Sequence, residues 1–232
     1  MFLAVFGDVH GNLPALEAVV EAIDNRGIHT VCNTGDCAVG YPWPNEVIAL
    51  LRDRAVISVQ GETDRLAVRV ARKAAALQRR LDEDRFRAVQ WTHDHLAVRN
   101  IEYLRDLPLQ RTLRVEGIDI ALFHGLPTTQ AETLHGDDDA MRFQRVRESV
   151  NVPLVLCGKS HVPYAREVDD TLFVNPGSVG VTSGDGSRTR FAIVDTDAAP
   201  WKVEVLTIPY DGDRAEKALR EQGLPAPPRY LG

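Results

Sequence analysis

The fold is decided by the stretch Phe2-Leu3-Ala4-Val5-Phe6, which is followed at once by Gly7-Asp8-Val9-His10-Gly11-Asn12. Five consecutive apolar residues indicate a strand that is buried on both faces of a parallel sheet. After this strand, Asn12 is a plausible N-cap and Gly27 a plausible end for a helix. The apolar residues between them recur at helical spacing, at Leu13, Leu16, Val19, Val20 and Ile23. The opening therefore predicts strand, loop and helix.

The same pattern occurs twice more along the chain. A second strand is expected at 30–33 and ends in Gly35-Asp36, and a third is expected at 55–59 and ends in Gly61-Glu62-Thr63-Asp64. A helix over about 45–52 separates them. Right-handed crossovers bring the carboxyl ends of such strands to one edge of the sheet, where ligands of open α/β sheets bind. We therefore expect the acidic residues at these strand ends to lie close together.

The rest of the chain predicts one α/β domain with a helical insertion. Residues 65–106 read as helical, and strands are expected at 112–115 and 119–123, the latter ending in His124-Gly125. A helix within 135–149 leads to a strand at 153–157, which ends in Gly158-Lys159-Ser160-His161. Antiparallel strands are expected at 164–168, 171–174, 190–195 and 201–207. We predict a main domain over 1–210, with 65–106 as insertion or lid, and a C-terminal helix and tail over 211–232.

Composition excludes several classes of protein. The 232 residues include 27 Lys and Arg against 33 Asp and Glu, which gives a net charge of −6. We therefore do not expect general nucleic-acid binding. The apolar fraction of 44% matches a globular protein, and no stretch approaches the roughly 20 apolar residues of a membrane span. Three widely spaced cysteines and the lack of a signal pattern lead us to expect reduced thiols and a cytoplasmic location.

Five predicted strand ends carry potential metal ligands. Carboxylates mixed with imidazoles suit Mn, Fe, Zn or Ni better than Ca or a thiolate-bound metal. Each residue alone is more simply a hydrogen-bonded structural residue or a helix cap. Their occurrence at corresponding strand ends favours a divalent transition-metal site built from Asp8, His10, Asp36, Glu62, His124 and His161.

These motifs, in this order, resemble the calcineurin-like metallophosphoesterases, whose signature is D-x-H, G-D, G-N-H-D/E, a lone His and G-H-x-H. Further segments resemble the bacterial branch related to YfcE and to diadenosine tetraphosphatases: residues 40–46, Trp91-Thr92, and Asn175-Pro-Gly-Ser-Val-Gly180. The resemblance covers residues 2 to about 208. It implies two packed sheets flanked by helices, a four-layer α/β/β/α sandwich with the metal at the sheet edge.

The resemblance also implies roles for single residues. A first metal would be bound by Asp8, His10 and His161, with Asp36 bridging to a second metal. The family's second site corresponds here to Asp36, Glu62, His124 and Lys159, and a protonated lysine cannot be a ligand. Thr63 replaces the histidine that protonates the leaving group in the family.

Glu62 and Lys159 both differ from the ligands of the family's second metal site, and we interpret the two differences as one change. An ammonium–carboxylate pair would occupy the region of the second metal, and Lys159 would act as a phosphate-binding point charge. The alternative is drift after loss of activity, which leaves a nucleotide- or phosphate-binding protein without turnover.

The sequence thus predicts a metal-dependent phosphoesterase, either a phosphodiesterase or a nucleotide pyrophosphohydrolase, that acts on a small phosphorylated substrate. The catalytic group would comprise Asp36, His124, Lys159 and Asn12, and substrate would contact Asn12, Lys159, Trp43 and Asn175. Trp43 either stacks on a nucleobase or packs its own loop. The segment 65–87 has eight Arg or Lys against three acids and is either a positive lid or a solvated helix face. A third alternative makes the insertion the working surface of an interaction module. A homodimer is compatible with all three.

Overall fold

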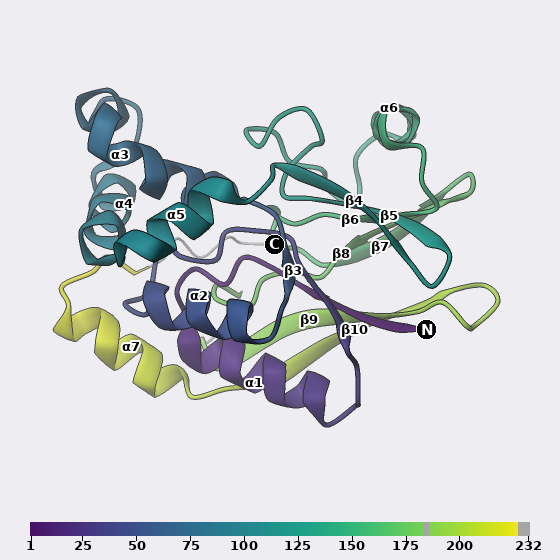
Figure 1. The fold of residues 1–232 in the computed structure, drawn as a ribbon, viewed down its shortest axis with the longest axis horizontal. Helices are drawn as coiled ribbons and strands as arrows, with labels where there is room; N and C mark the ends of the chain where they lie inside the picture. Colours follow the sequence, from purple (N-terminus) through teal and green to yellow (C-terminus); the bar gives the residue numbers. More distant parts are fainter. Residues whose placement is uncertain (183–185, 227–232) are drawn as a thin grey trace.

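The computed structural model describes residues 1–182 and 186–226, and two five-stranded sheets dominate it (Figure 1). The first sheet has the order β10–β9–β1–β2–β3. β1 pairs parallel with β2 and antiparallel with β9, so the opening strand lies at the centre of its sheet, as a continuous apolar run predicts. The strands span β1 (Phe2–Phe6), β2 (Thr30–Asn33), β3 (Ile57–Ser58), β9 (Arg188–Asp195) and β10 (Lys202–Pro209).

The second sheet has the order β4–β5–β6–β8–β7. Its strands are β4 (Gln110–Val115), β5 (Ile118–Phe123), β6 (Leu154–Leu156), β7 (Tyr164–Val168) and β8 (Thr171–Asn175). The prediction that the last four strands are purely antiparallel is wrong for β8, which pairs parallel with β6 on one side and antiparallel with β7 on the other. β8 follows β7 through a tight turn, and this hairpin places it beside β6.

Seven helices surround the sheets in the described residues: α1 (Leu13–Asp24), α2 (Pro44–Asp53), α3 (Glu62–Gln78), α4 (Glu83–His95), α5 (Val98–Asp106), α6 (Ala140–Val150) and α7 (Gly212–Glu221). Helices α3 to α5 form the expected insertion between β3 and β4, and they gather at one end of the molecule (Figure 1). No described helix combines the length and apolar character that crossing a membrane would need.

Alternating side chains divide the core into layers. Leu3 and Val5 pack with Ile120 and Leu154 in a core between the two sheets. Residues of the opposite pleat face the helices, with Ala4 and Phe6 against α1 and α2, and Ala121, Phe123 and Phe173 against α6. The four-layer α/β/β/α sandwich is confirmed.

The third strand is shorter than predicted, because residues 55 and 56 still form hydrogen bonds with the last turn of the preceding helix. The Ala55 N–H donates to Arg52 O and the Val56 N–H donates to Leu51 O. Ala55 itself adopts a left-handed φ of 49°. Pairing with β2 therefore begins only at Ile57.

Candidate metal centre

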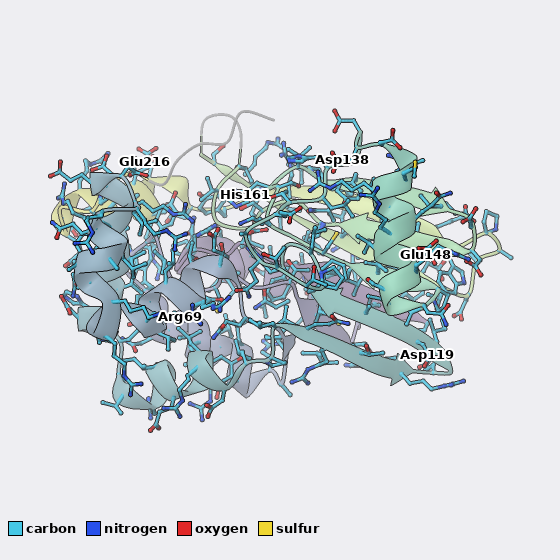
Figure 2. The ribbon with its side chains drawn as sticks, turned by 90° about the horizontal axis from the view of Figure 1, so that it is seen from above. Arg69, Asp119, Asp138, Glu148, His161 and Glu216 are labelled. Carbon is cyan, nitrogen blue, oxygen red and sulfur yellow. The ribbon has the colours of Figure 1, made fainter. Side chains whose placement is uncertain are left out.

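Five of the six expected ligand residues come from four loops that follow strands of both sheets. Asp8 and His10 follow β1, Asp36 follows β2, His124 follows β5, and His161 follows β6. Figure 2 shows His161 near the middle of the molecule, between the α3 helix that carries Arg69 and the α6 helix that carries Glu148. The carboxyl ends of strands in two packed sheets thus meet at one place.

Two groups of three ligands share Asp8. Asp8, His10 and His161 form one group, and Asp8, Asp36 and His124 form the other, with all ligand atoms of a group within 4.8 Å of one another. His161 Nε2 lies 3.3 Å from Asp8 Oδ1 and 3.3 Å from His10 Nε2. His124 Nε2 lies 3.3 Å from Asp36 Oδ2.

Backbone carbonyls fix two of the imidazole rings. His10 Nδ1 lies 2.8 Å from Val39 O, and His124 Nδ1 lies 3.0 Å from Thr34 O. Because a carbonyl oxygen can only accept, each Nδ1 carries a proton and donates it. In the neutral ring the lone pair is then on Nε2, which faces His161 Nε2 in the case of His10 and the Asp36 carboxylate in the case of His124. Metal-binding histidines are oriented in this way.

The residues fit a divalent transition metal. Asp8 Oδ1 and His124 Nε2 are buried and lack a hydrogen-bond partner among the described residues. With His124 in its neutral form, both atoms carry unused lone pairs, which are costly when buried, and a cation between them would satisfy both. The mixture of oxygen and nitrogen donors suits Mn, Fe, Zn or Ni.

The backbone at the site is held in an uncommon conformation. Positive φ angles occur at Asp8 (52°), His10 (53°), Asp36 (54°), Lys159 (72°) and His161 (60°). Left-handed non-glycine residues are uncommon and gather at functional sites. The backbone approaches closely here as well, since a Cβ on Gly180 would lie 2.0 Å from Val9 O.

Charge is concentrated and buried at this centre. Burial alone would raise the pKa of Asp36, but the neighbouring His124 and His10 outweigh it and hold that pKa well below its usual range. For His124 burial alone would lower the pKa, yet the Asp36 and Asp8 carboxylates raise it to about 9. Burial, together with the charge of His161, lowers the pKa of His10. The metal-free centre therefore keeps its carboxylates ionised and draws a proton to His124.

Glu62 lies outside both ligand groups. Its Oε2 accepts from Lys159 Nζ at 2.6 Å and from Arg85 Nη2 at 3.1 Å. The expected ammonium–carboxylate contact is therefore present, and it engages Glu62 as an ion-pair partner. Lys159 is also tied to the metal ligands through its backbone, because its N–H donates to Asp8 Oδ2 at 3.1 Å.

Asp64 contributes to the start of α3 and also contacts the loop that carries Asp36. The fully buried carboxylate accepts from the backbone N–H of Gly61, which caps its own helix, and from those of Cys37 and Ala38. Asp64 thereby fixes the loop that carries Asp36. Sequence reasoning missed this link between two ligand-bearing loops.

The side chains of Asn12 and Asn175 are used within the protein. Asn12 accepts from the Ala15 N–H and donates to Gly180 O and to the hydroxyl of Tyr210. Asn175 donates to Gly158 O and Ser160 Oγ and accepts from the Gly177 N–H. Both residues are fully buried. These bonds support the positioning of site loops and give no support to direct contact with substrate.

Trp43 lies against the C-terminal helix. Its indole packs in a cluster with Tyr41, Ala215 and Leu219, and the Arg214 guanidinium carbon lies 5.5 Å from the ring centroid. Trp43 does not line the cavity described below. Of the two readings of this residue, the geometry favours loop packing over base stacking.

A cavity of about 420 Å³ opens at the metal centre. It is lined from the centre by His10 and Thr63, from the insertion by Asp82, Asp84, Arg85 and Ala88, and on the remaining side by Val39, Gly40, Val181, Pro225 and Ala226. Its size lies within the range of small-molecule sites. Lys159 and the candidate ligand His124 do not line this cavity.

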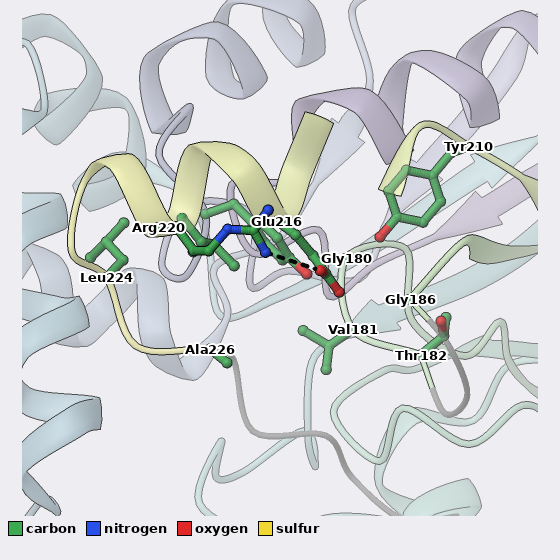
Figure 3. Close-up of a pocket in the computed structure, with 11 residues that line it drawn as sticks. Gly180, Val181, Thr182, Gly186, Tyr210, Glu216, Arg220, Leu224 and Ala226 are labelled. Atoms are coloured by element: carbon green, nitrogen blue, oxygen red, sulfur yellow. Dashed lines mark hydrogen bonds and ion pairs between the residues drawn. The ribbon is translucent and has the colours of Figure 1, made fainter. Parts of the chain in front are cut away.

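A second cavity of about 260 Å³ borders on the same residues, Val181 and Ala226. Figure 3 shows it beside α7, where Arg220 Nη1 lies 3.5 Å from Glu216 Oε2. Tyr41, Tyr210, Leu219 and Leu224 give it an aromatic and aliphatic wall.

Comparison with known proteins agrees with this geometry. Residues 1–199 match the calcineurin-like phosphoesterase superfamily domain. The chain therefore belongs to the calcineurin-like phosphoesterase superfamily.

The chain is similar to a protein of known sequence and to two solved structures. An uncharacterised protein of Methanocaldococcus jannaschii, MJ0912, is 28% identical over 248 residues, which cover 96% of this chain and 93% of that protein. A metallophosphoesterase from Sphaerobacter thermophilus has a TM-score of 0.77 and 26% identity, with 97% and 95% of the two chains covered. The hypothetical protein PH1004 from Pyrococcus horikoshii has a TM-score of 0.86 at 23% identity, with 97% and 94% covered, and shows the same fold.

Proposed function

We propose that this protein hydrolyses a phosphodiester or a nucleotide phosphoanhydride with the help of a bound divalent transition metal. The observation that carries the proposal is the sharing of Asp8 between two buried ligand groups beside a cavity of about 420 Å³. Membership of the superfamily and the similarity to a metallophosphoesterase support the same class of reaction.

The ligands proposed for the metal are Asp8, His10, Asp36, His124 and His161. When bound, a divalent cation supplies positive charge for the phosphoryl oxygens and lowers the pKa of water toward neutrality. The chain contributes orientation, since Val39 O and Thr34 O hold two imidazoles with Nε2 toward the ligand cluster. Thr63 N–H donates to Asp36 Oδ1 at 2.8 Å and fixes that carboxylate.

Lys159 is proposed as the second positive charge of the site. Its partly buried ammonium lies beside Glu62, where it would offset charge on phosphoryl oxygens that approach the centre. Glu62 is then a positioning residue for this ammonium and no longer a proposed metal ligand. His124 remains both a ligand and a catalytic candidate.

Thr63 stands at the position of the family's histidine that protonates the leaving group. Thr63 lines the cavity, and its buried hydroxyl has no hydrogen-bond partner among the described residues. A hydroxyl can donate a hydrogen bond but is too weak an acid to transfer a proton near neutral pH. We therefore propose substrates with good leaving groups, such as nucleotide anhydrides, cyclic nucleotides or aryl phosphodiesters. We also propose a small phosphorylated or nucleotide substrate and a cytoplasmic location for the protein, and a homodimer is compatible with both.

Hydrolysis of bis-p-nitrophenyl phosphate with and without added Mn²⁺ tests the activity. We expect metal-dependent release of p-nitrophenol, and its loss by at least about a hundredfold in Asp36→Asn, which removes a ligand charge. Asp119→Asn is the matched control, because this carboxylate is half exposed and pairs with Arg114 far from the centre (Figure 2). Equal, metal-independent rates in all three proteins would contradict the proposal.

A second candidate is a phosphate- or nucleotide-binding protein without turnover. The ion pair between Lys159 and Glu62, in the region of the family's second metal, favours it. The triple variant Glu62→Asn, Thr63→His, Lys159→His would then create activity that the wild type lacks. If the wild type already turns over substrate, this second candidate is wrong.

A further inference from the structure

Arg85, in the helical insertion, contacts Glu62 and lines the cavity beside the candidate metal centre. It lies in the first turn of α4, and its Nη2 is 3.1 Å from Glu62 Oε2. Lys159 Nζ is 2.6 Å from the same oxygen. One carboxylate oxygen of Glu62 thus contacts two cations from distant parts of the chain. Arg85 lies in the insertion and Lys159 in the loop after β6.

At Glu62 itself, two cations share one carboxylate, so one positive charge there is not balanced by Glu62. A single carboxylate balances one cation, and Lys159 is the closer and the more buried of the two, with its side chain 14% exposed against 35% for Arg85. The charge of Arg85 is therefore the one available to a ligand. Its exposure is toward the cavity, which Arg85 lines together with His10.

The guanidinium also has unused hydrogen-bonding capacity. Within the part of the chain that the structure describes, its bond to Glu62 is made by Nη2 alone. Arginine offers five N–H donors in a planar fork, and such a fork binds phosphate oxygens in pairs. Arg85 can keep Glu62 and still donate to an anion.

Two carboxylates share the cavity wall with Arg85, and both have partners. Asp82 caps α4 by accepting from the Arg85 N–H at 2.8 Å. Asp84 lies 3.7 Å from Arg87 Nη1 and is 71% exposed, so it faces solvent. The insertion therefore presents Arg85 on the cavity wall together with two carboxylates, and Arg85 is the group of this wall that can bind an anion.

We propose that Arg85 is a specificity-determining residue that binds a second phosphoryl group of the substrate. The inference rests on the proposed function, in which the metal ligands and Lys159 take the phosphoryl group that reacts. Arg85 then binds the phosphoryl group next to it. The substrate class is a phosphoanhydride or another ester with two adjacent phosphoryl groups, and the insertion acts as the element that selects it.

Direct binding of AMP and ADP to the manganese-loaded protein tests this inference, because the two probes differ by one phosphoryl group. Calorimetric affinities would be compared for the wild type, Arg85→Ala, Arg85→Lys and Arg69→Ala. Arg69 is an exposed arginine on α3 and gives the same change of charge in the insertion without a contact to Glu62. Metal content and the unfolding temperature of each variant are measured in parallel.

We expect the wild type to bind ADP at least about tenfold more tightly than AMP, since a charge-assisted hydrogen-bond pair is worth that much. Arg85→Ala should lose this preference while its AMP affinity changes less than about threefold. Arg85→Lys should keep part of it, and Arg69→Ala all of it.

An unchanged preference in Arg85→Ala, or a wild type without any preference, would overturn the inference. A parallel loss of AMP and ADP affinity together with a lower unfolding temperature would show a structural role and would also overturn it. Failure of the proposed function is a separate result, namely binding of ADP with the expected preference but no hydrolysis of any substrate by the wild type.

Discussion

The ammonium of Lys159 lies 2.6 Å from Glu62 Oε2, in the region where the superfamily resemblance places ligands of a second metal. A protonated amine is not a ligand, and its positive charge compensates the carboxylate that a metal would otherwise compensate. We propose that the pair replaces a cation together with the charge of its ligands.

Metal stoichiometry should change when this pair is replaced. We expect about one tightly bound metal per chain in the wild type and about two in the double variant Glu62→Asn, Lys159→His, which supplies neutral ligands in place of the ion pair. Plasma mass spectrometry after dialysis measures this ratio. Lys159→Gln, which removes the charge without adding an imidazole, is the control and should stay near one. Two tightly bound metals in the wild type would show that Lys159 does not occupy the second position.

The leaving group should govern the rate. Because Thr63 lines the cavity without an acidic group, rates on p-nitrophenyl phosphodiesters should exceed those on alkyl phosphodiesters by a large factor. Thr63→His should raise the rate on alkyl esters by about a hundredfold, the usual contribution of a general acid, with a smaller gain on p-nitrophenyl esters. Steady-state kinetics on both substrates measure the two ratios, and Thr63→Asn controls for side-chain volume. Equal wild-type rates on alkyl and aryl esters would show that protonation is not limiting.

Metal binding should release a proton. The Asp36 and Asp8 carboxylates, acting against burial, raise the pKa of His124 from 6.5 to about 9 in the metal-free protein. The ring must lose this proton before Nε2 can bind a cation. We expect about one proton released per manganese bound near pH 7.5, and an apparent affinity that rises with pH until about 9. Calorimetry in buffers of different ionisation enthalpy measures the release.

The same raised pKa affects the stability of the metal-free protein. The stabilisation from protonated His124 is fully present below pH 6.5 and is lost as the pH rises through about 9. His124→Asn should abolish both the proton release on manganese binding and this pH dependence of stability. His135→Asn, at an exposed histidine, should abolish neither. Manganese binding without proton release at pH 7.5 would contradict the assignment of the proton to His124.

The clustering of five of the six candidate ligands could be predicted because strand ends are visible in a sequence. Asp8, Asp36, His124 and His161 each follow an apolar strand, and the topology of parallel strands brings such positions together. The approach of Arg85 to Glu62 could not be predicted, since helical periodicity shows which face of α4 is buried but not where its first turn lies relative to α3. Side-chain direction was the other difficulty. Asn12 and Asn175 were expected to contact substrate, yet their amides bond to backbone and hydroxyl groups of the loops they hold.

Asp64 should contribute strongly to stability. Its carboxylate, fully buried, accepts from three backbone N–H groups, those of Gly61, Cys37 and Ala38, at 3.0–3.1 Å. Asp64→Ala leaves these donors buried and unpaired, and we expect the free energy of unfolding to fall by about 3 kcal/mol or more. Asp64→Asn keeps one acceptor oxygen and should lose roughly half as much.

Urea-induced unfolding of the metal-free protein measures these losses. Asp94→Ala, at an exposed α4 carboxylate that accepts from Gln90, is the matched control and should change stability by less than about 0.5 kcal/mol. Because Cys37 and Ala38 directly follow Asp36, the loss of these bonds should also release the loop that carries this ligand. Manganese affinity should therefore fall in Asp64→Ala and stay unchanged in Asp94→Ala. Equal stabilities of the two variants would show that the three N–H groups find other partners and that Asp64 does not hold the Asp36 loop.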